Sequence, residues 1–179
     1  DYVGINFNYP KLLKKLKSYF KFNFGYCPKI FFVDHHVSHA YSAYYPSGFR
    51  NANIITFDFS GDGTSTTLSV ARKNKITKLK EFKKPNSLGI FYGLITQVLG
   101  FNIDNDEYKV MGLASFGKAK YNFNDILKIN KHGYKLNTKI INEDELIKAK
   151  SLNITRQEPF FSNYLLKKLN IRQRMSKGN

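Results

Sequence analysis

Two segments decide the fold: DHHVSHAYSAYYPSGF at residues 34–49 and IITFDFSGDGT at residues 54–64. The first segment places His35 and His39 four positions apart at the start of a predicted helix, so both rings project from one helix face. The second segment begins with β-branched and aromatic residues typical of a buried strand and ends in a glycine-rich turn. A helix that leads into a strand and a tight turn predicts an α/β fold.

Three side chains in these segments form the donor set of a predicted metal site. The imidazoles of His35 and His39 supply two nitrogen ligands for zinc or iron. Asp58 is the leading candidate for a third ligand, because it directly follows the predicted strand at residues 54–57. Three protein ligands leave the remaining coordination positions open for water or substrate, as catalytic sites require.

Asp34 and His36 lie beside the two ligating histidines and are predicted to orient them. A ligating histidine usually donates its other ring N–H to a carboxylate or carbonyl oxygen, which fixes the ring. The alternative is an ordinary helix start, in which Asp34 is the N-cap and the histidines are solvated or hydrogen-bonded. Three of the four histidines in the chain fall within five residues, which shifts the balance toward a site.

A second candidate site is the turn formed by Ser60, Gly61, Asp62, Gly63 and Thr64. Its two glycines free the backbone to present successive N–H groups, and its two hydroxyls add polar contacts, a composition suited to holding a phosphate. Asp-Gly between two apolar runs is also a strong signal for an ordinary β-hairpin turn. The two interpretations are compatible, because the turn of a hairpin can itself bind phosphate.

Composition limits the classes of protein that the chain can represent. Lysine and arginine number 29 against 13 acidic residues, and the net charge of +16 favours anionic ligands such as nucleotides or nucleic acid. Nucleic acid is a less favoured partner, because the lysines are spread among apolar and aromatic residues along the chain. Cys27 is the only cysteine, which excludes an internal disulfide and indicates a reducing, cytoplasmic compartment. No apolar run approaches the length of a membrane span, so we expect no membrane partner.

The hydrophobic pattern predicts further elements around the two segments. A basic amphipathic helix at residues 10–21 is expected to pack on a sheet, and residues 29–33 are expected to be a sheet strand leading to the histidines. Residues 75–83 are predicted as an edge strand, and Ser87 as the cap of a helix that runs to about residue 99. The remaining expectations are a helix opening at Glu107, a strand at residues 134–141, and helices at residues 143–149 and 159–169.

Four segments carry a resemblance to a known family: VDHHVSHAYSAYYPSGF, ITFDFSGDGT, SLGIFYGLITQVLGF and DEYKVMGLASFG. In this order and at these intervals, over about residues 29–118, they resemble the O-carbamoyltransferases of antibiotic and nodulation-factor biosynthesis. The resemblance implies a ribonuclease-H-like lobe of the actin, sugar-kinase and Hsp70 type, similar to the catalytic subunit of the tRNA threonylcarbamoyladenosine machinery. Family members are several times longer. Residues 1–179 are therefore expected to be a single partial domain, the first lobe of the family's N-terminal domain, incomplete at both ends.

The resemblance also implies roles for single residues. The family's histidine pair falls on His35 and His39, its aspartate ligand on Asp58, and its nucleotide-binding turn on the glycine-rich turn described above. Glu107 and Lys109 match a motif that lines the family's active cleft, where they are candidate catalytic residues. A lysine there would bring positive charge to a phosphate or carbamoyl oxygen.

One departure from the family pattern lies in the turn. Phe59 and Ser60 follow Asp58, whereas family members usually have a glycine directly after the aspartate. The Ser60–Gly61 pair instead resembles the Ser-Gly-Gly turn of the tRNA-modifying relatives. Because of this departure, the resemblance identifies the fold more firmly than it identifies the acceptor substrate.

The activity implied by the resemblance is metal-assisted O-carbamoyl transfer. Carbamoyl phosphate and ATP would give carbamoyl-adenylate, and a divalent metal, iron or zinc, would polarise the carbamoyl carbonyl while a substrate hydroxyl attacks and AMP leaves. The acceptor would be a sugar or another natural product. A second lobe and an adenylate-forming domain would complete the enzyme. Two alternatives remain: a tRNA-modifying enzyme of the threonylcarbamoyl type, and a non-catalytic lobe that binds nucleotide or a partner.

Overall fold

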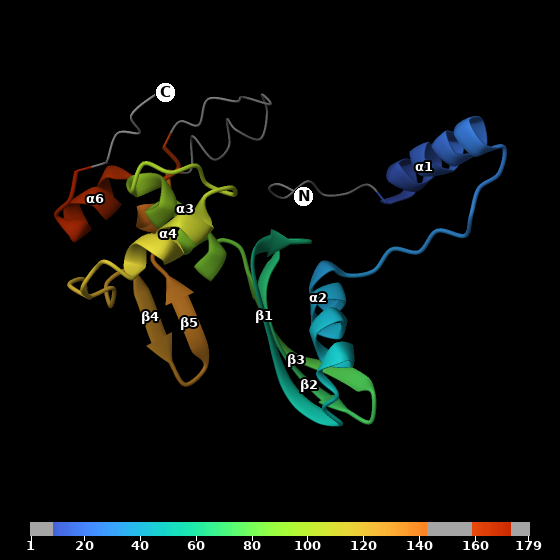
Figure 1. Cartoon of the computed structure of the whole chain (residues 1–179), viewed down its shortest axis with the longest axis horizontal. Coiled ribbons are helices and arrows are strands. Elements are labelled where there is room, and N and C mark those ends of the chain that lie inside the picture. The colour runs from blue at the N-terminus through green and yellow to red at the C-terminus, as the bar shows by residue number, and fades with distance from the viewer. Residues whose placement is uncertain (1–8, 143–158, 173–179) are drawn as a thin grey trace.

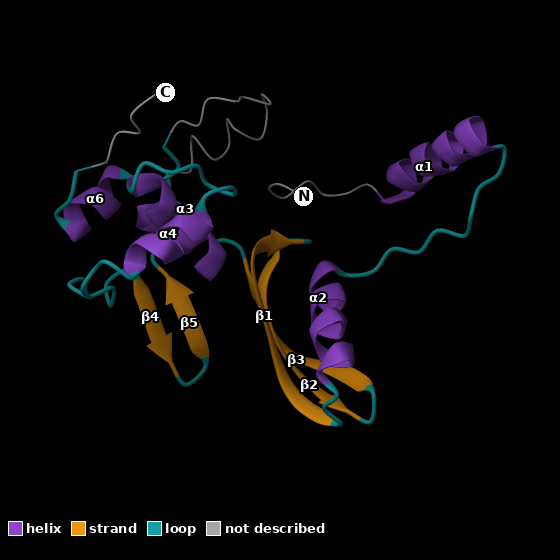
Figure 2. Ribbon diagram, viewed as in Figure 1, coloured by secondary structure: helices purple, strands orange, loops and turns teal. Residues whose placement is uncertain are grey.

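The computed structural model describes residues 9–142 and 159–172, which form a mixed α/β fold (Figures 1 and 2). The predicted helix at residues 143–149 lies outside the described residues. In chain order the elements are α1 (Tyr9–Phe24), α2 (His35–Tyr44), the 3-10 turn η1 (Tyr45–Ser47), β1 (Asn51–Gly61), β2 (Thr64–Arg72), β3 (Lys75–Lys83), α3 (Leu88–Val98), α4 (Glu107–Ala114), β4 (Leu127–Asn130), β5 (Gly133–Leu136), the 3-10 turn η2 (Thr138–Ile140) and α6 (Asn163–Leu169).

Strands β1, β2 and β3 form an antiparallel sheet in that order, and β3 has the bounds that the sequence predicts. The turn between β1 and β2 consists of Asp62 and Gly63, whose φ angles are +52° and +82°. Positive φ at both positions defines a type I′ turn, which matches the twist of paired strands. The hairpin interpretation of this turn is therefore confirmed.

The pairing of β1 with β2 is interrupted close to this turn. The register is regular up to Phe57, which lies opposite Thr66, and resumes at Gly61, which lies opposite Thr64. Residues 58–60 of β1 therefore lie opposite the single residue Ser65. Such a β-bulge bends the strand and redirects its side chains, and bulges are common beside functional sites. Asp58 is the first residue of this bulge.

Helix α2 packs on one face of the sheet. Its buried Ala40 and Tyr44 form a small apolar cluster with Ile54 of β1 and Ala71 of β2. Asp34 begins the helix as predicted for an N-cap, because its carboxylate accepts the N–H of Val37 at 2.8 Å. This packing places the first turn of α2 beside the bulged end of β1 (Figure 1).

The larger apolar core surrounds α3. Ser87 caps this helix by accepting the N–H of Ile90 at 3.0 Å, in agreement with the sequence prediction. The buried members of the core come from α3, the β4–β5 hairpin, η2, α6 and residues next to these elements, and they are Ile90, Leu94, Val98, Ile126, Leu136, Ile140, Ile141, Phe161, Leu165 and Leu169. This cluster holds the N-terminus of α3 against the bulge in β1.

Leu94 is expected to be a major contributor to this core. It is 1% exposed, so Leu94→Ala should lower the free energy of unfolding by about 2–5 kcal/mol, measured by urea denaturation. Leu79 on β3 is 65% exposed, and Leu79→Ala should change the same quantity by less than about 0.5 kcal/mol. Equal losses for the two variants would contradict the assignment of the core.

Two expectations about the N-terminal part are wrong. Residues 29–33 are extended but pair with no strand among the described residues, and Phe31 is 71% exposed. Residues with high strand propensity are those that fit a half-buried pleated surface. They form a strand only where a neighbouring strand is present to pair with them. Helix α1 is confirmed as a helix, yet none of its described side chains is buried and it projects away from the sheet (Figure 1).

The predicted strand at residues 134–141 is shorter in the structure. Strand β5 ends at Leu136, and Asn137 then caps η2 by accepting the N–H of Lys139. The predicted helix at residues 159–169 begins later, as α6. Within the part of the chain that the structure describes, no helix has the length and apolar character needed to cross a membrane.

Candidate functional site

The side chains of His35, His39 and Asp58 meet at the junction of α2 and β1. The Nε2 atom of His35 lies 2.5 Å from Asp58 Oδ2 and 2.9 Å from His39 Nε2, and His39 Nε2 lies 3.2 Å from Asp58 Oδ2. Ligand atoms about 2.1 Å from a tetrahedral zinc ion are roughly 3.4 Å apart. The two longer separations lie within about half an ångström of that value. The shortest separation, 2.5 Å between His35 Nε2 and Asp58 Oδ2, is about 0.9 Å below that value, so these two groups would move apart to hold an ion. With that adjustment the three donors fit a metal ion that keeps one open position.

The charge state of Asp58 suits a ligand. Desolvation raises the pKa of its carboxyl, but hydrogen bonds from the His35 ring, from the Phe59 N–H and from the His39 ring outweigh it, so the pKa lies below its ordinary value. Asp58 Oδ1 accepts the Phe59 N–H at 2.6 Å, which leaves Oδ2 to face the two histidines. The carboxylate is thus ionised and oriented at neutral pH.

His36 fastens α2 to the sheet. The ring is 2% exposed, and its Nε2 donates to the carbonyl of Thr64 at 2.9 Å. In the neutral ring Nδ1 is then the acceptor, and the hydroxyl of Thr56 lies 2.7 Å from it. The Thr56 hydroxyl also contacts that of Thr67 at 2.7 Å, so a buried polar chain runs from α2 across β1 to β2. This chain joins the first turn of α2 to β1 two residues before Asp58.

The glycine-rich turn packs directly against the histidines. A Cβ atom on Gly61 would lie 2.0 Å from Cδ2 of the His35 ring, so only glycine leaves room for the ring there. Asp62 Oδ2 accepts the backbone N–H of His35 at 3.0 Å. The turn is therefore joined to the first residue of α2, and nothing lies within 4 Å of the position that a Cβ on Gly63 would take.

The other turn residues differ in access. Thr64 is buried and its carbonyl is engaged by His36, whereas Ser60 is partly exposed. Phe59 packs against the core around α3. The structure thus brings the predicted phosphate turn and the predicted metal ligands together at one end of the hairpin.

Glu107 and Lys109 lie on α4, outside the cluster of histidines. The Lys109 amine pairs with Asp106 at 2.7 Å, and a Glu107 carboxylate oxygen accepts the N–H of Asp104 at 2.7 Å. Partial desolvation, together with the negative charges of Glu107 and Asp58, raises the pKa of Asp104 to about 6. The loop before α4 therefore lies within electrostatic range of Asp58, while the charge of Lys109 is held by Asp106.

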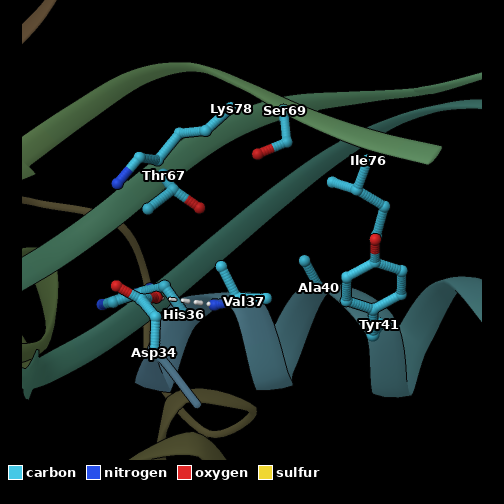
Figure 3. A pocket seen from close by; sticks show the side chains of 9 residues that line it. All are labelled: Asp34, His36, Val37, Ala40, Tyr41, Thr67, Ser69, Ile76 and Lys78. Atoms are coloured by element: carbon cyan, nitrogen blue, oxygen red, sulfur yellow. Dashed lines mark hydrogen bonds between the residues drawn. The ribbon is translucent and has the colours of Figure 1, made fainter.

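Asp34 and His36 also line a pocket on the other flank of α2, between that helix and β2 and β3 (Figure 3). The pocket has a volume of about 180 Å³, and its lining includes Thr67, Ser69 and Lys78 but none of the three clustered donors. Among the described residues, neither Asp34 nor His36 has a hydrogen bond to the ring of His35 or His39. Asp34 instead caps α2, and His36 joins that helix to the sheet.

Ser87 and Gly89 of the α3 N-terminus also contact the backbone of the site. The Ser87 hydroxyl lies 3.0 Å from the carbonyl oxygen of Asp58, and a Cβ on Gly89 would lie 2.5 Å from the backbone nitrogen of Phe59. The sequence signal for Ser87 was that of a helix cap alone. The contact with Asp58 depends on the bulge in β1, which no local pattern locates.

Comparison with known proteins identifies relatives of this chain. Residues 3–176 match the family described as Carbamoyltransferase N-terminus. Nodulation protein NolNO of Sinorhizobium fredii is 44% identical over 89 residues, which are 50% of this chain and 13% of that protein. Nodulation protein NolO of Bradyrhizobium diazoefficiens is 41% identical over 85 residues, 48% of this chain and 15% of that protein.

A third relative, an uncharacterized protein of Synechocystis, is 40% identical over 94 residues, which are 52% of this chain and 15% of that protein. The aligned part of the chain thus spans 13–15% of the length of these three relatives. The family match covers nearly all of the chain, and the donor cluster, the hairpin turn and α3 lie inside it. This chain therefore belongs to the carbamoyltransferase N-terminus family.

Proposed function

We propose that this chain is the metal-binding part of a longer O-carbamoyltransferase. The observation that carries the proposal is the convergence of His35, His39 and Asp58, whose donor atoms all lie within 4.8 Å of one another. Family membership supports the reaction class, and the partly exposed cluster leaves access for a substrate. The reaction would transfer a carbamoyl group from carbamoyl-adenylate, made from carbamoyl phosphate and ATP, to the hydroxyl of a sugar or another natural product.

A metal ion held by the three donors would supply Lewis acidity toward the carbamoyl carbonyl. His35 and His39 would each bind the ion through Nε2, and Asp58 would bind it through Oδ2, the carboxylate oxygen that faces both rings. The acceptor oxygen would form a bond to the carbamoyl carbon while the bond from that carbon to the AMP phosphate oxygen breaks. AMP would leave with the electron pair, and the hydroxyl proton would pass to solvent.

The glycine-rich turn would bind the nucleotide phosphates in this proposal. Gly63 is open to approach, and the turn lies against the first residue of α2. Glu107 would lie near the same site, because its carboxylate accepts the N–H of Asp104, whose pKa the negative charge of Asp58 helps to raise. Lys109 would contact a phosphate only if its ion pair with Asp106 were first broken.

The proposed architecture is one ribonuclease-H-like lobe, treated as a single partial domain, whose cleft is completed by a second lobe and an adenylate-forming domain. The antiparallel β1–β2–β3 sheet followed by α3 supports this assignment. The cytoplasm is the proposed compartment, in line with a single, exposed cysteine at position 27.

Metal content and ATP binding test the proposal. The purified chain, supplied with Zn²⁺ or Fe²⁺ and then desalted, is expected to retain about one metal ion per molecule by mass spectrometry, as a three-ligand site requires. Calorimetry on the same sample is expected to show ATP binding at the turn. A chain that stays metal-free after exposure to both ions would contradict the proposed site.

A further inference from the structure

The bulge in β1 carries the Asp58 ligand and is held from outside the sheet. Regular pairing with β2 stops after Phe57 and resumes at Gly61, so the sheet ladder alone does not define the backbone of residues 58–60. The Ser87 hydroxyl lies 3.0 Å from the carbonyl oxygen of Asp58 and 2.9 Å from that of Phe59. Ser87 is 0% exposed, so its proton is confined to these two acceptors.

Gly89 brings the backbone of α3 into direct contact with the same bulge. A Cβ at this position would lie 2.5 Å from the nitrogen of Phe59, 2.6 Å from its Cα and 2.7 Å from the carbonyl carbon of Asp58. All three atoms belong to the backbone, which has no flexible side chain to move aside. The first turn of α3 therefore contacts the bulge in two ways: the Ser87 hydroxyl bonds to it, and the absence of a side chain at Gly89 allows the two backbones to approach.

The orientation of the carboxylate follows from this backbone. Asp58 Oδ1 accepts the N–H of Phe59, and this bond leaves Oδ2 directed at His35 and His39. A shift of the peptide between Asp58 and Phe59 would turn the carboxylate away from the two rings. Metal sites require their ligands to be held within about 0.5 Å of the productive geometry.

We propose that Ser87 and Gly89 are positioning residues for the Asp58 ligand: α3 fixes the bulge, and the bulge fixes the carboxylate. The inference rests on the proposed metal-binding function. At other metal sites, groups that hydrogen-bond to a ligand hold that ligand in its orientation, and their loss typically weakens metal binding by about 10–100-fold. The inference gives this orienting role to the first turn of α3.

The test is Ser87→Ala in the full chain, with the dissociation constant measured for Co²⁺ and Zn²⁺. We expect Ser87→Ala to weaken binding by roughly 10–100-fold and to change the visible absorption of bound Co²⁺, which reports ligand geometry. Ser87→Thr keeps the hydroxyl and should restore affinity toward that of the unmodified chain. The matched control is Thr96→Val, because Thr96 is also 0% exposed on α3 but donates within the helix to the carbonyl of Tyr92.

A metal-free readout separates this inference from the proposed function. Amide hydrogen exchange at Phe59 and Ser60 is expected to be faster in Ser87→Ala and unchanged in Thr96→Val. If the unmodified chain bound no metal, the proposed function would fail, and the exchange rates would still decide whether α3 holds the bulge. Unchanged exchange in Ser87→Ala, or equal loss of metal affinity in Ser87→Ala and Thr96→Val, would overturn the inference.

Discussion

The double substitution His35→Ala, His39→Ala is expected to remove metal binding. Both rings direct Nε2 at the same point, and their loss leaves Asp58 as the single donor of the cluster. The dissociation constant for Zn²⁺ should therefore rise by more than the roughly 10–100-fold caused by losing a supporting outer group. Calorimetric titration of the purified variant measures the change.

His132 provides the matched control for this experiment. It is the fourth histidine of the chain and is exposed. Its backbone N–H donates to the Asn130 side chain, and its carbonyl accepts from the Lys80 amine. His132→Ala should leave the Zn²⁺ affinity unchanged. A double variant that still retains stoichiometric metal would show that the ion binds elsewhere. The proposed role of a metal ion at this cluster in carbamoyl transfer would then be contradicted.

Gly61→Ala is expected to disrupt the site without removing a ligand. The added methyl would lie 2.0 Å from the His35 ring, so either the ring or the end of β1 must move. Forcing a methyl group into a packed position typically costs about 1–3 kcal/mol, and displacement of the ring should weaken metal binding as well. Urea denaturation and metal titration of the same variant measure the two effects.

Gly112→Ala is the corresponding control, since nothing lies within 4 Å of the position that its Cβ would take. Gly112 belongs to α4, where alanine is favoured over glycine by about 0.8–1.0 kcal/mol, so this variant should be slightly stabilised. Opposite signs for the same chemical change would establish that the close approach to His35, and not glycine content, limits position 61. Two equally stable variants would contradict that conclusion.

The sequence predicts the parts of the site that depend on local patterns. The spacing of His35 and His39 places both rings on one helix face, and the apolar run before Asp58 predicts a strand. The Asp-Gly pair predicts the turn that returns the chain to β2. These local signals suffice to bring the candidate ligands together, because helix, strand and turn are consecutive and pack on one another.

The parts that sequence reasoning missed depend on contacts between distant segments. The run at residues 29–33 has the composition of a strand, but the described residues offer it no strand to pair with. His36 was expected to orient the ligating rings, whereas its contacts cross the sheet to Thr56 and Thr64. Ser87 shows only a capping signal, because its second contact depends on a bulge that lies 28 positions earlier in the chain.

The short sequence separation of the three donors affects how the site forms. Asp58 follows His35 by 23 positions, and the I′ turn at Asp62 and Gly63 begins four positions after Asp58. Closing a loop of this length costs about 1.3 kcal/mol less entropy than closing one of about 100 residues. Most of the contacts that assemble the donors are thus available as soon as the first hairpin is made. The two histidines and Asp58 can therefore be brought close before α3 packs, and the final orientation of the carboxylate depends on α3.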